Sequence, residues 1–278
     1  MSNEIQTTKG NNQIGFTSFM TSGVVQKKIN EILGDEQSGK RFISSIISAV
    51  NTNPSLKECH NASILSGALL GESLNLSPSP QLGRMYLVPF KDKNRGMVAQ
   101  FLLGYKGYLE LAMRSGQYKD INVMEIREGE YKGRDKLNGN PTFEFIENDD
   151  ERDSKEVIGY MASLTLVNGF TKTIYMTKKQ MEDHALQYSN GYRADKKNKT
   201  SYTFWSKDFD GMAYKTMLRQ LISKWGIMSI EMQQAYEGDM AYIKEDGTKE
   251  YVDNEDFTMG EVEPVVIEEE PKGIDDIE

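Results

Sequence analysis

The chain has 278 residues, with 33 Lys and Arg against 42 Asp and Glu, which gives a formal net charge of -9. Hydrophobic residues make up 38% and charged residues 27% of the sequence, a balance typical of a soluble globular protein with one large core or two small ones. The sequence has no run near the roughly 18 apolar residues of a membrane span, and Met1 to Asn12 lack a signal-peptide centre. A single cysteine, Cys59, excludes an internal disulfide framework, and with only His60 and His184 no zinc cluster is expected. We therefore expect an intracellular protein with a reduced thiol.

Charge is distributed unevenly along the chain. From Lys244 to the end there are 3 basic and 14 acidic residues, a local charge of -11, which leaves residues 1–243 at +2. Residues 84–119 and 177–225 each carry +5, and residues 120–156 between them carry -6. This alternation indicates a polarised surface. The alternative is that the lysines and arginines only keep helix faces solvated.

Both ends of the chain are predicted to be disordered. Residues 244–278 have few large apolar side chains, a run of three glutamates and two prolines, so they bury too little surface to offset the entropy of ordering. Residues 1–22 are polar and rich in Gly, Asn and Thr. Residues 23–243 remain as a single domain.

Apolar spacing and turn residues predict the elements of that domain. The first elements are a helix over 40–51, a helix around 64–69, a hairpin of strands 85–88 and 98–103, and a short helix that ends at Gly116. Strands near 121–126 and 142–146 follow, and then a hairpin over 157–176 that turns at Asn168-Gly169. The last elements are a helix with a capping box at Thr177 and Gln180, a Lys- and Asn-rich loop over 189–203, and helices over 208–225 and 230–242. Helices at both ends around antiparallel hairpins indicate an α+β fold, not a doubly wound sheet.

Two motifs suggest chemistry that their context does not favour. The segment Gly34–Lys40 has the spacing of a phosphate-binding loop, but Arg41 stands where Ser or Thr would hold magnesium, and the preceding segment is helix-like. ATP hydrolysis is therefore not expected. Cys59 and His60 are adjacent, and neighbours in sequence rarely form a nucleophile pair, so a packing role is predicted.

Carboxylates are numerous at 149–153, at 182–183 and at Asp208 and Asp210. A metal-dependent nuclease needs two or three of them to converge on Mg²⁺. The first group lies in a predicted loop, and Asp208 and Asp210 begin a helix, where acidic groups favour the helix dipole. We predict no catalytic residues and no metal site. A Mg²⁺-dependent nuclease stays an alternative, because convergence in space is not visible in the sequence.

Basic residues alternate with aromatic ones over 84–119, and Lys215 and Arg219 share one face of a predicted helix. Cations that follow phosphates and aromatic platforms for bases are what single-strand binders need. Two alternatives remain: the aromatics form the core and the cations are solvated, or the basic blocks of a non-enzymatic assembly protein meet acidic protein surfaces.

These residues also carry a resemblance. The segments Leu74–Ser77, Tyr86–Phe90 and Gly104–Gly116, and the spaced residues from Trp205 to Arg219, resemble the RecT family of phage and prophage single-strand annealing recombinases. The likeness spans about residues 60–240. It implies an ATP-independent protein that binds single-stranded DNA, anneals it into duplex and oligomerises as rings or helical filaments, in the bacterial cytoplasm. It also implies a phage exonuclease as partner and no cofactor, with Mg²⁺ at most screening phosphates.

We expect the cations in the matching motifs to neutralise phosphates in one continuous groove. These are Lys106, Arg114, Lys207, Lys215 and Arg219, with Arg84, Lys91 and Lys224 as further candidates. Tyr105 and Tyr108 are candidates for base stacking, although a core role suits either equally. The acidic tail is expected to compete with DNA, to recruit a host partner, or only to solubilise the chain.

Overall fold

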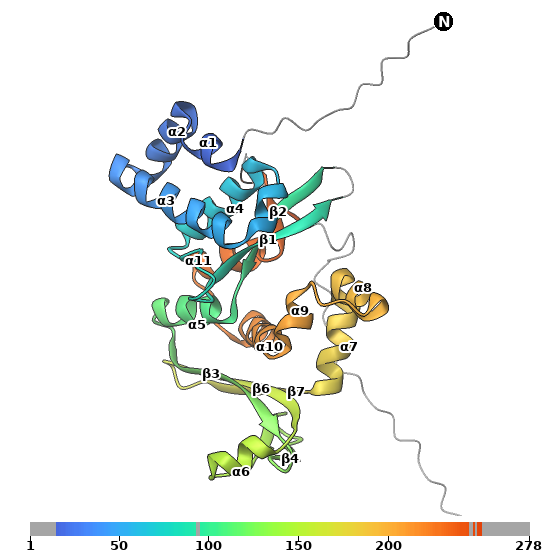
Figure 1. The fold of residues 1–278 in the computed structure, drawn as a ribbon. Coiled ribbons are helices and arrows are strands. Elements are labelled where there is room, and N and C mark those ends of the chain that lie inside the picture. The colour runs from blue at the N-terminus through green and yellow to red at the C-terminus, as the bar shows by residue number, and fades with distance from the viewer. Residues whose placement is uncertain (1–14, 93–94, 245–246, 248, 252–278) are drawn as a thin grey trace, which may run out of the picture.

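The structure is a computed structural model that describes residues 15–92, 95–244, 247 and 249–251. It confirms the predicted α+β fold with antiparallel sheets (Figure 1). The upper part in Figure 1 holds six helices, a short 3-10 turn and a four-stranded sheet. The lower part holds a three-stranded sheet and the two-stranded β4–β5 ribbon. No helix within these described ranges has both the length and the apolar character needed to cross a membrane.

The upper part begins with helices and continues into the first sheet. Its elements are α1 (Phe16–Met20), α2 (Gly23–Leu33), α3 (Glu36–Thr52), η1 (Pro54–Glu58), α4 (Asn61–Ser73), β1 (Met85–Asp92), β2 (Gly96–Leu103), α5 (Tyr105–Arg114), α11 (Ile230–Gly238), β8 (Ala241–Ile243) and β9 (Lys249–Tyr251). The sheet order is β1-β2-β8-β9, with Met85 opposite Leu103 in the predicted first hairpin. The inner end of β2 is buried between α4 and α11 because residues 98–103 are almost all apolar.

The lower part is built around the second predicted hairpin. Its elements are β3 (Tyr118–Arg127), β4 (Tyr131–Arg134), β5 (Pro141–Phe143), α6 (Asp149–Ser154), β6 (Val157–Leu166), β7 (Thr171–Thr177), α7 (Lys178–Tyr188), α8 (Asn190–Asn198), α9 (Phe204–Lys207) and α10 (Phe209–Trp225). The sheet order is β3-β6-β7. The β6–β7 turn contains Gly169 at φ 88°, as an Asn-Gly turn requires. The capping box of Thr177 and Gln180 is also present.

Helix α10 lies between the two parts and contributes to both cores (Figure 1). Leu218 and Ile222 pack in the upper core, whereas Met217 and Leu221 pack in the lower core. Residues one position apart on a helix point about 100° away from each other, so one helix can serve two cores. This arrangement places the N-terminal end of α10 beside α5 and β3.

The predicted loop over 189–203 instead contains α8. Ser189 caps this helix by accepting a hydrogen bond from Tyr192 N. The buried carboxylate of Asp195 then accepts hydrogen bonds from the hydroxyls of Thr200, Thr203 and Ser206. A polar sequence therefore folds here around one carboxylate, which apolar periodicity does not reveal.

Both predicted boundaries of the domain also differ from the structure. The disordered segment was predicted to extend to residue 22, but α1 forms there because Phe16 and Met20 are buried against the neighbouring helices. At the other end, the last helix stops at Gly238, not 242, and β9 pairs with β8 beyond the predicted boundary at residue 243. The predicted disorder of residues 1–14 and 252–278 lies outside the described residues.

Candidate nucleic-acid interface

Four elements from three separate segments of the chain meet at one aromatic and basic surface, which we name the junction surface. It consists of Arg84, which directly precedes β1, Tyr86 from β1, Tyr105 and Lys106 from α5, Phe204 and Lys207 from α9, and Tyr214 from α10. The aromatic side chains are half-buried and the two lysines are exposed.

The aromatic rings of the junction surface form two adjoining pairs. Tyr86 and Phe204 have ring centroids 5.1 Å apart, and Tyr105 meets Tyr214 edge to face at 5.5 Å. Burial raises the pKa of Tyr86, and the nearby Asp208 carboxylate and Tyr105 hydroxyl raise it further. Such half-exposed rings are suitable platforms for unpaired bases.

Two glycines make this convergence possible by bringing the start of α5 against the chain before β1. Gly104 N donates a hydrogen bond to the carbonyl oxygen of Arg84 at 2.8 Å. A Cβ atom at Gly104 would overlap the carbonyl oxygen of Gly83, and one at Gly107 would overlap that of Arg84. The close approach sets Lys106 beside the β1 residues, with its Nζ 5.9 Å from the Tyr105 ring centroid.

The cations of the junction surface differ in whether a nearby carboxylate neutralises their charge. Arg84 Nε lies 2.5 Å from Glu110 Oε2, so part of its charge is neutralised. Lys106 and Lys207 are exposed at the ends of α5 and α9. Asp208 follows Lys207 directly and caps α10 by accepting a hydrogen bond from Gly211 N. We therefore expect a phosphate to approach from the side of Lys106 and Lys207, away from this carboxylate.

The structure contradicts the predicted phosphate contacts of Lys215 and Arg219. Asp239 is completely buried, and its carboxylate lies 2.7 Å from Lys215 Nζ and 3.1 Å from Arg219 Nη1. Lys215 is 5% exposed, and burial lowers its pKa although Asp239 raises it. Arg219 also lies over the ring of Tyr236 at 3.8 Å. These two cations hold α10 to the segment after α11 and do not face a groove.

Tyr108 is likewise part of this buried cluster and not a stacking platform. Its side chain is 0% exposed, and its hydroxyl donates a hydrogen bond to Asp239 Oδ2 at 3.2 Å. Burial raises the pKa of Tyr108 well above its ordinary value. Of the two alternatives for Tyr108, the core role is therefore correct. Tyr105 is half-buried and lies on the junction surface.

The remaining predicted cations lie elsewhere. Arg114 donates a hydrogen bond from Nη1 to the carbonyl oxygen of Leu74 at 2.7 Å and so holds the chain after α4. Lys91 is exposed near the far end of the first hairpin, and Lys224 is exposed at the end of α10. The eight predicted cations thus do not line one channel, and of them only Arg84, Lys106 and Lys207 belong to the junction surface.

Of the four aromatic residues of the junction surface, sequence reasoning proposed only Tyr105 for base stacking. Tyr86, Phe204 and Tyr214 were not stacking candidates, and Tyr214 falls within the apolar stripe of its helix. In the structure the Tyr214 hydroxyl donates a hydrogen bond to Glu125 Oε2 at 2.5 Å, so this ring stands at the edge of the core. One signal that could have found these residues is a large aromatic within three positions of Lys or Arg: Tyr86 lies two positions after Arg84, Phe204 three before Lys207, and Tyr214 directly before Lys215.

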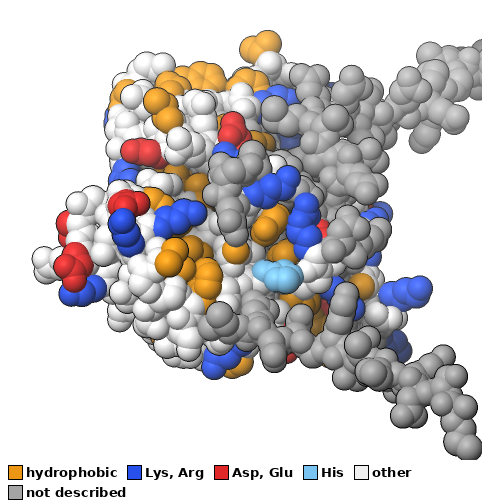
Figure 2. Space-filling view, turned by 90° about the horizontal axis from the view of Figure 1, so that it is seen from above, with side chains coloured by type: hydrophobic (Ala, Val, Ile, Leu, Met, Phe, Trp, Pro, Cys, Tyr) orange, Lys and Arg blue, Asp and Glu red, His pale blue; other side chains and the backbone are white. Residues whose placement is uncertain are grey.

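Basic side chains are also prominent on the upper face of the molecule. In the view from above, Lys and Arg lie among hydrophobic side chains around a histidine, and Asp and Glu lie mainly toward one edge (Figure 2). This mixture agrees with the polarised charge that the sequence predicts.

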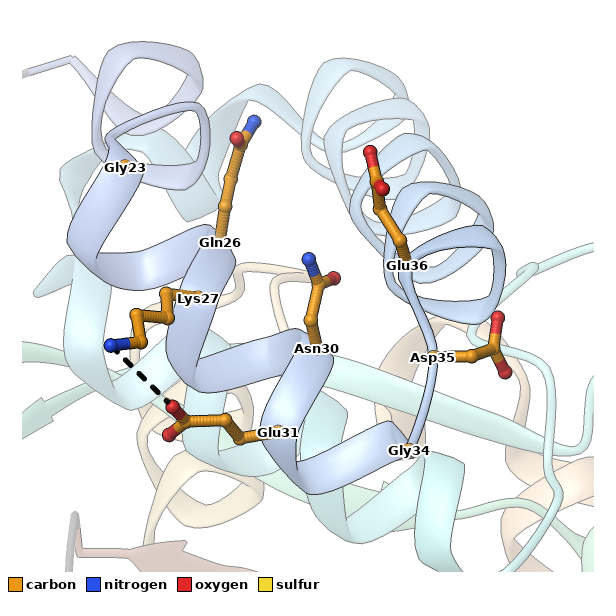
Figure 3. A pocket seen from close by; sticks show the side chains of 8 residues that line it. All are labelled: Gly23, Gln26, Lys27, Asn30, Glu31, Gly34, Asp35 and Glu36. Carbon is orange, nitrogen blue, oxygen red and sulfur yellow. Dashed lines mark ion pairs between the residues drawn. The ribbon is translucent and has the colours of Figure 1, made fainter.

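The region that mimics a phosphate-binding loop is a turn between two helices. Gly34 ends α2 at φ 85°, and Asp35 caps α3 by accepting a hydrogen bond from Ser38 N at 2.7 Å. Figure 3 shows that the hollow between these helices presents carboxylates, and Glu31 in it pairs with Lys27. Helix α2, and not a strand, leads directly into the turn, and the carboxylates of the turn would repel phosphate, so this turn lacks the structure of an ATP site.

Other candidate chemistry is weak in the described ranges. There, no group of three or more His, Cys, Asp or Glu side chains is arranged to hold a metal ion. Asp210 accepts a hydrogen bond from the Tyr160 hydroxyl at 2.5 Å, and Asp208 caps α10. Cys59 is buried, which raises the pKa of its thiol to about 12, so it is not a ready nucleophile.

Comparison with known proteins gives consistent matches. Residues 40–256 match the sequence model of the RecT family. The chain is 39% identical over 261 residues to the uncharacterized protein YqaK of Bacillus subtilis (strain 168), which covers 94% of this chain and 81% of the relative. It is 27% identical over 251 residues to Protein RecT of Escherichia coli (strain K12), which covers 85% of this chain and 86% of the relative. The family match contains every residue of the junction surface.

Proposed function

The chain belongs to the RecT family, and from this premise we propose that it holds single-stranded DNA on the junction surface and anneals it to a complementary strand. Membership of this family implies single-strand annealing in recombination. The observation that supports this placement is the contact between the half-buried rings of Tyr86 and Phe204. Exposed Lys207 lies three residues after Phe204 on α9, and exposed Lys106 follows half-buried Tyr105 on α5.

The physical task in annealing is to bring two polyanions together. Lysines on the surface neutralise phosphates and release condensed counterions, which favours binding of any sequence. Aromatic rings hold bases by their faces, at about 1–3 kcal/mol per stacked base, and leave the Watson–Crick edges available. Base pairing with the second strand then provides the sequence specificity, and the protein provides geometry.

We further propose that annealing needs no ATP and that the protein works as a ring or helical oligomer, supplied with single strands by a phage exonuclease. One junction surface offers few cations, so an oligomer that aligns many copies would follow a strand continuously. In this account Mg²⁺ acts only by screening phosphates between the strands.

The placement is tested by the double variant Lys106→Ala, Lys207→Ala. We expect weaker oligonucleotide binding, with the slope of log K against log salt reduced in size by about 1.4, or 0.7 for each lost single-strand contact. The matched control is Lys178→Ala, Lys179→Ala, which removes the same charge from exposed positions at the start of α7. An unchanged slope and affinity in the folded junction variant would exclude these lysines from the binding surface.

The activity itself is tested with labelled complementary strands, Mg²⁺ and no ATP. Intact annealed products support the proposal. Shortened products would indicate the nuclease alternative, and an absence of salt-sensitive binding to oligonucleotides would favour an assembly protein.

A further inference from the structure

An exposed apolar patch with two lysines lies at the end of α10 that is opposite the junction surface. We name it the Trp225 patch; it consists of Val167, Phe170, Lys172, Lys224, Trp225 and Ile227. Its four apolar side chains are between 37% and 60% exposed. Trp225 lies about 16 Å along the helix axis from Tyr214, so the patch and the junction surface are separate.

The side chains of the patch are held together by direct contacts. The rings of Phe170 and Trp225 are stacked, with centroids 6.3 Å apart and an interplanar angle of 23°. Lys172 Nζ lies 4.9 Å and Lys224 Nζ 5.8 Å from the centroid of the Trp225 ring. Lys172 also donates a hydrogen bond to the carbonyl oxygen of Asn138 at 2.8 Å, which fixes its position. The cations therefore flank one aromatic pair.

Neighbouring backbone contacts make the patch continuous. The hydroxyl of Tyr118 donates a hydrogen bond to the carbonyl oxygen of Ile227 at 2.9 Å, and Val167 N donates one to the carbonyl oxygen of Gln117 at 3.0 Å. The segment Gln117-Tyr118 thus joins the β6–β7 turn to the chain after α10. Contiguous exposed apolar side chains with a charged rim are typical of an interaction site.

The composition of the patch favours an acidic and apolar peptide over a nucleic acid. A DNA strand would use the lysines and one or two rings, but it would leave the aliphatic side chains of Val167 and Ile227 in water. A peptide with both aliphatic and carboxylate side chains would bury the first and pair the second.

The chain carries such a peptide in its own C-terminal region. Residues 262–270 read Val-Glu-Pro-Val-Val-Ile-Glu-Glu-Glu, and they combine four aliphatic side chains with four glutamates. Residues 252–278, which follow the last described residue Tyr251, hold 11 acidic residues and 1 basic residue. Their charge is complementary to that of the two lysines.

The length of chain is sufficient to reach the patch. Along the chain, residues 228–248 separate the patch from β9, and they include α11, about 14 Å long, and the short strand β8. Residues 252–261 span up to about 35 Å when extended. Either the same molecule or a neighbouring copy can therefore present residues 262–270 to the patch.

We propose that residues 262–270 dock on the Trp225 patch, with Val265, Val266 and Ile267 on its apolar side chains and Glu268–Glu270 facing Lys172 and Lys224. This site is distinct from the DNA surface, and it gives the acidic segment a protein partner within its own chain or oligomer. The proposal does not depend on the annealing activity.

The test uses the full chain with a photo-crosslinking residue, Ile267→benzoylphenylalanine, followed by mass spectrometry of the irradiated protein. We expect crosslinks to concentrate at residues 167–172 and 224–227. Crosslinks that persist on dilution place the contact within one molecule, and crosslinks that fall with dilution place it between copies; both support docking. Crosslinks at the junction surface, or none above those of unfolded protein, would overturn the proposal.

A second test of the proposal reverses the charge of the two lysines of the Trp225 patch. In the crosslinking chain, Lys172→Glu with Lys224→Glu is expected to reduce the crosslink yield at least fivefold. Lys178→Glu with Lys179→Glu is the matched control and is expected to leave the yield unchanged. An equal loss in both variants would show that only the overall charge matters and would overturn the assigned site. A change in oligomer size for Trp225→Ala, without crosslinks to the patch, would identify a contact between copies and also overturn it.

Discussion

Asp239 accepts a hydrogen bond from Lys215 Nζ at 2.7 Å, and both side chains are buried. The same carboxylate accepts hydrogen bonds from Tyr108, from Arg219 and from Leu103 N. One acidic side chain thus joins α10, α5 and β2, which are three of the elements behind the junction surface.

We expect Asp239→Ala to lower the free energy of unfolding by about 3–5 kcal/mol, because it leaves Lys215 and Arg219 buried without their counter-charge. Urea unfolding followed by circular dichroism measures this loss. The control is Glu237→Ala, two positions away, which removes the carboxylate of a more exposed ion pair with Lys249 and should cost at most about 1 kcal/mol. Equal effects of the two substitutions would contradict the structural role of Asp239.

The variant Lys215→Met tests whether Lys215 serves only the buried cluster around Asp239 or also contributes to DNA binding. Asp239 keeps Arg219 as its partner in this variant, so we expect a folded protein whose binding to single-stranded oligonucleotides has an unchanged salt dependence. Titrations at several salt concentrations make the comparison. If the slope of log K against log salt falls as much as in the Lys106 and Lys207 double variant, Lys215 does contact phosphate.

Tyr105→Ala is expected to weaken oligonucleotide binding by about tenfold, as the loss of one stacked base implies. Tyr105→Phe keeps the ring and should restore binding. Phe145→Ala, at an exposed aromatic beside the β4–β5 ribbon, is the control and should leave affinity unchanged. If Tyr105→Phe is as impaired as Tyr105→Ala, the hydroxyl and not the ring face is what matters.

Gly107→Ala is expected to destabilise the fold by about 1–3 kcal/mol, since its Cβ would overlap the carbonyl oxygen of Arg84. Gly23→Ala in α2 meets nothing within 4 Å and should be neutral or stabilising by about 0.5–1 kcal/mol. Thermal unfolding of both variants gives the comparison. A neutral Gly107→Ala would show that α5 can move away from β1.

Stability is expected to fall in mild acid because of His184. Burial and, to a smaller extent, the Arg219 charge together lower the pKa of this imidazole to about 4. Between pH 6.5 and 4 the unfolded chain binds a proton that the folded chain does not. The free energy of unfolding therefore decreases through this window as pH falls, by up to about 3 kcal/mol. His184→Gln should remove this component in urea titrations across pH, and an unchanged pH profile would contradict it.

Local patterns were sufficient to predict much of the fold. The two hairpins and the long helix are confirmed because alternation, an Asn-Gly turn and a one-turn apolar period are properties of adjacent residues. Strand β8 has three residues and pairs with a strand far earlier in the chain, so it leaves no local signal. Helix α8 depends on Asp195 and its hydroxyl partners, which apolar spacing does not show.

The site was harder to predict than the fold. The four-residue spacing of Lys215 and Arg219 correctly places them on one helix face, but the sequence does not show that Asp239 neutralises that face. Trp225 falls in the predicted apolar stripe yet is 37% exposed, because α10 ends beyond the core. Whether a charged side chain is free depends on contacts between distant segments, and these are set by tertiary packing.

Helix α10 packs in both the upper and the lower core, and this restricts how the molecule can move. Sliding or rotating that helix to admit a second strand would disturb the packing of Leu218 in one core and of Leu221 in the other at once. If DNA binds at the junction surface as proposed, we expect any widening to occur in the short segments at its edge, the first turn of α5 and the four-residue helix α9. The long helix is expected to keep its position while these segments move.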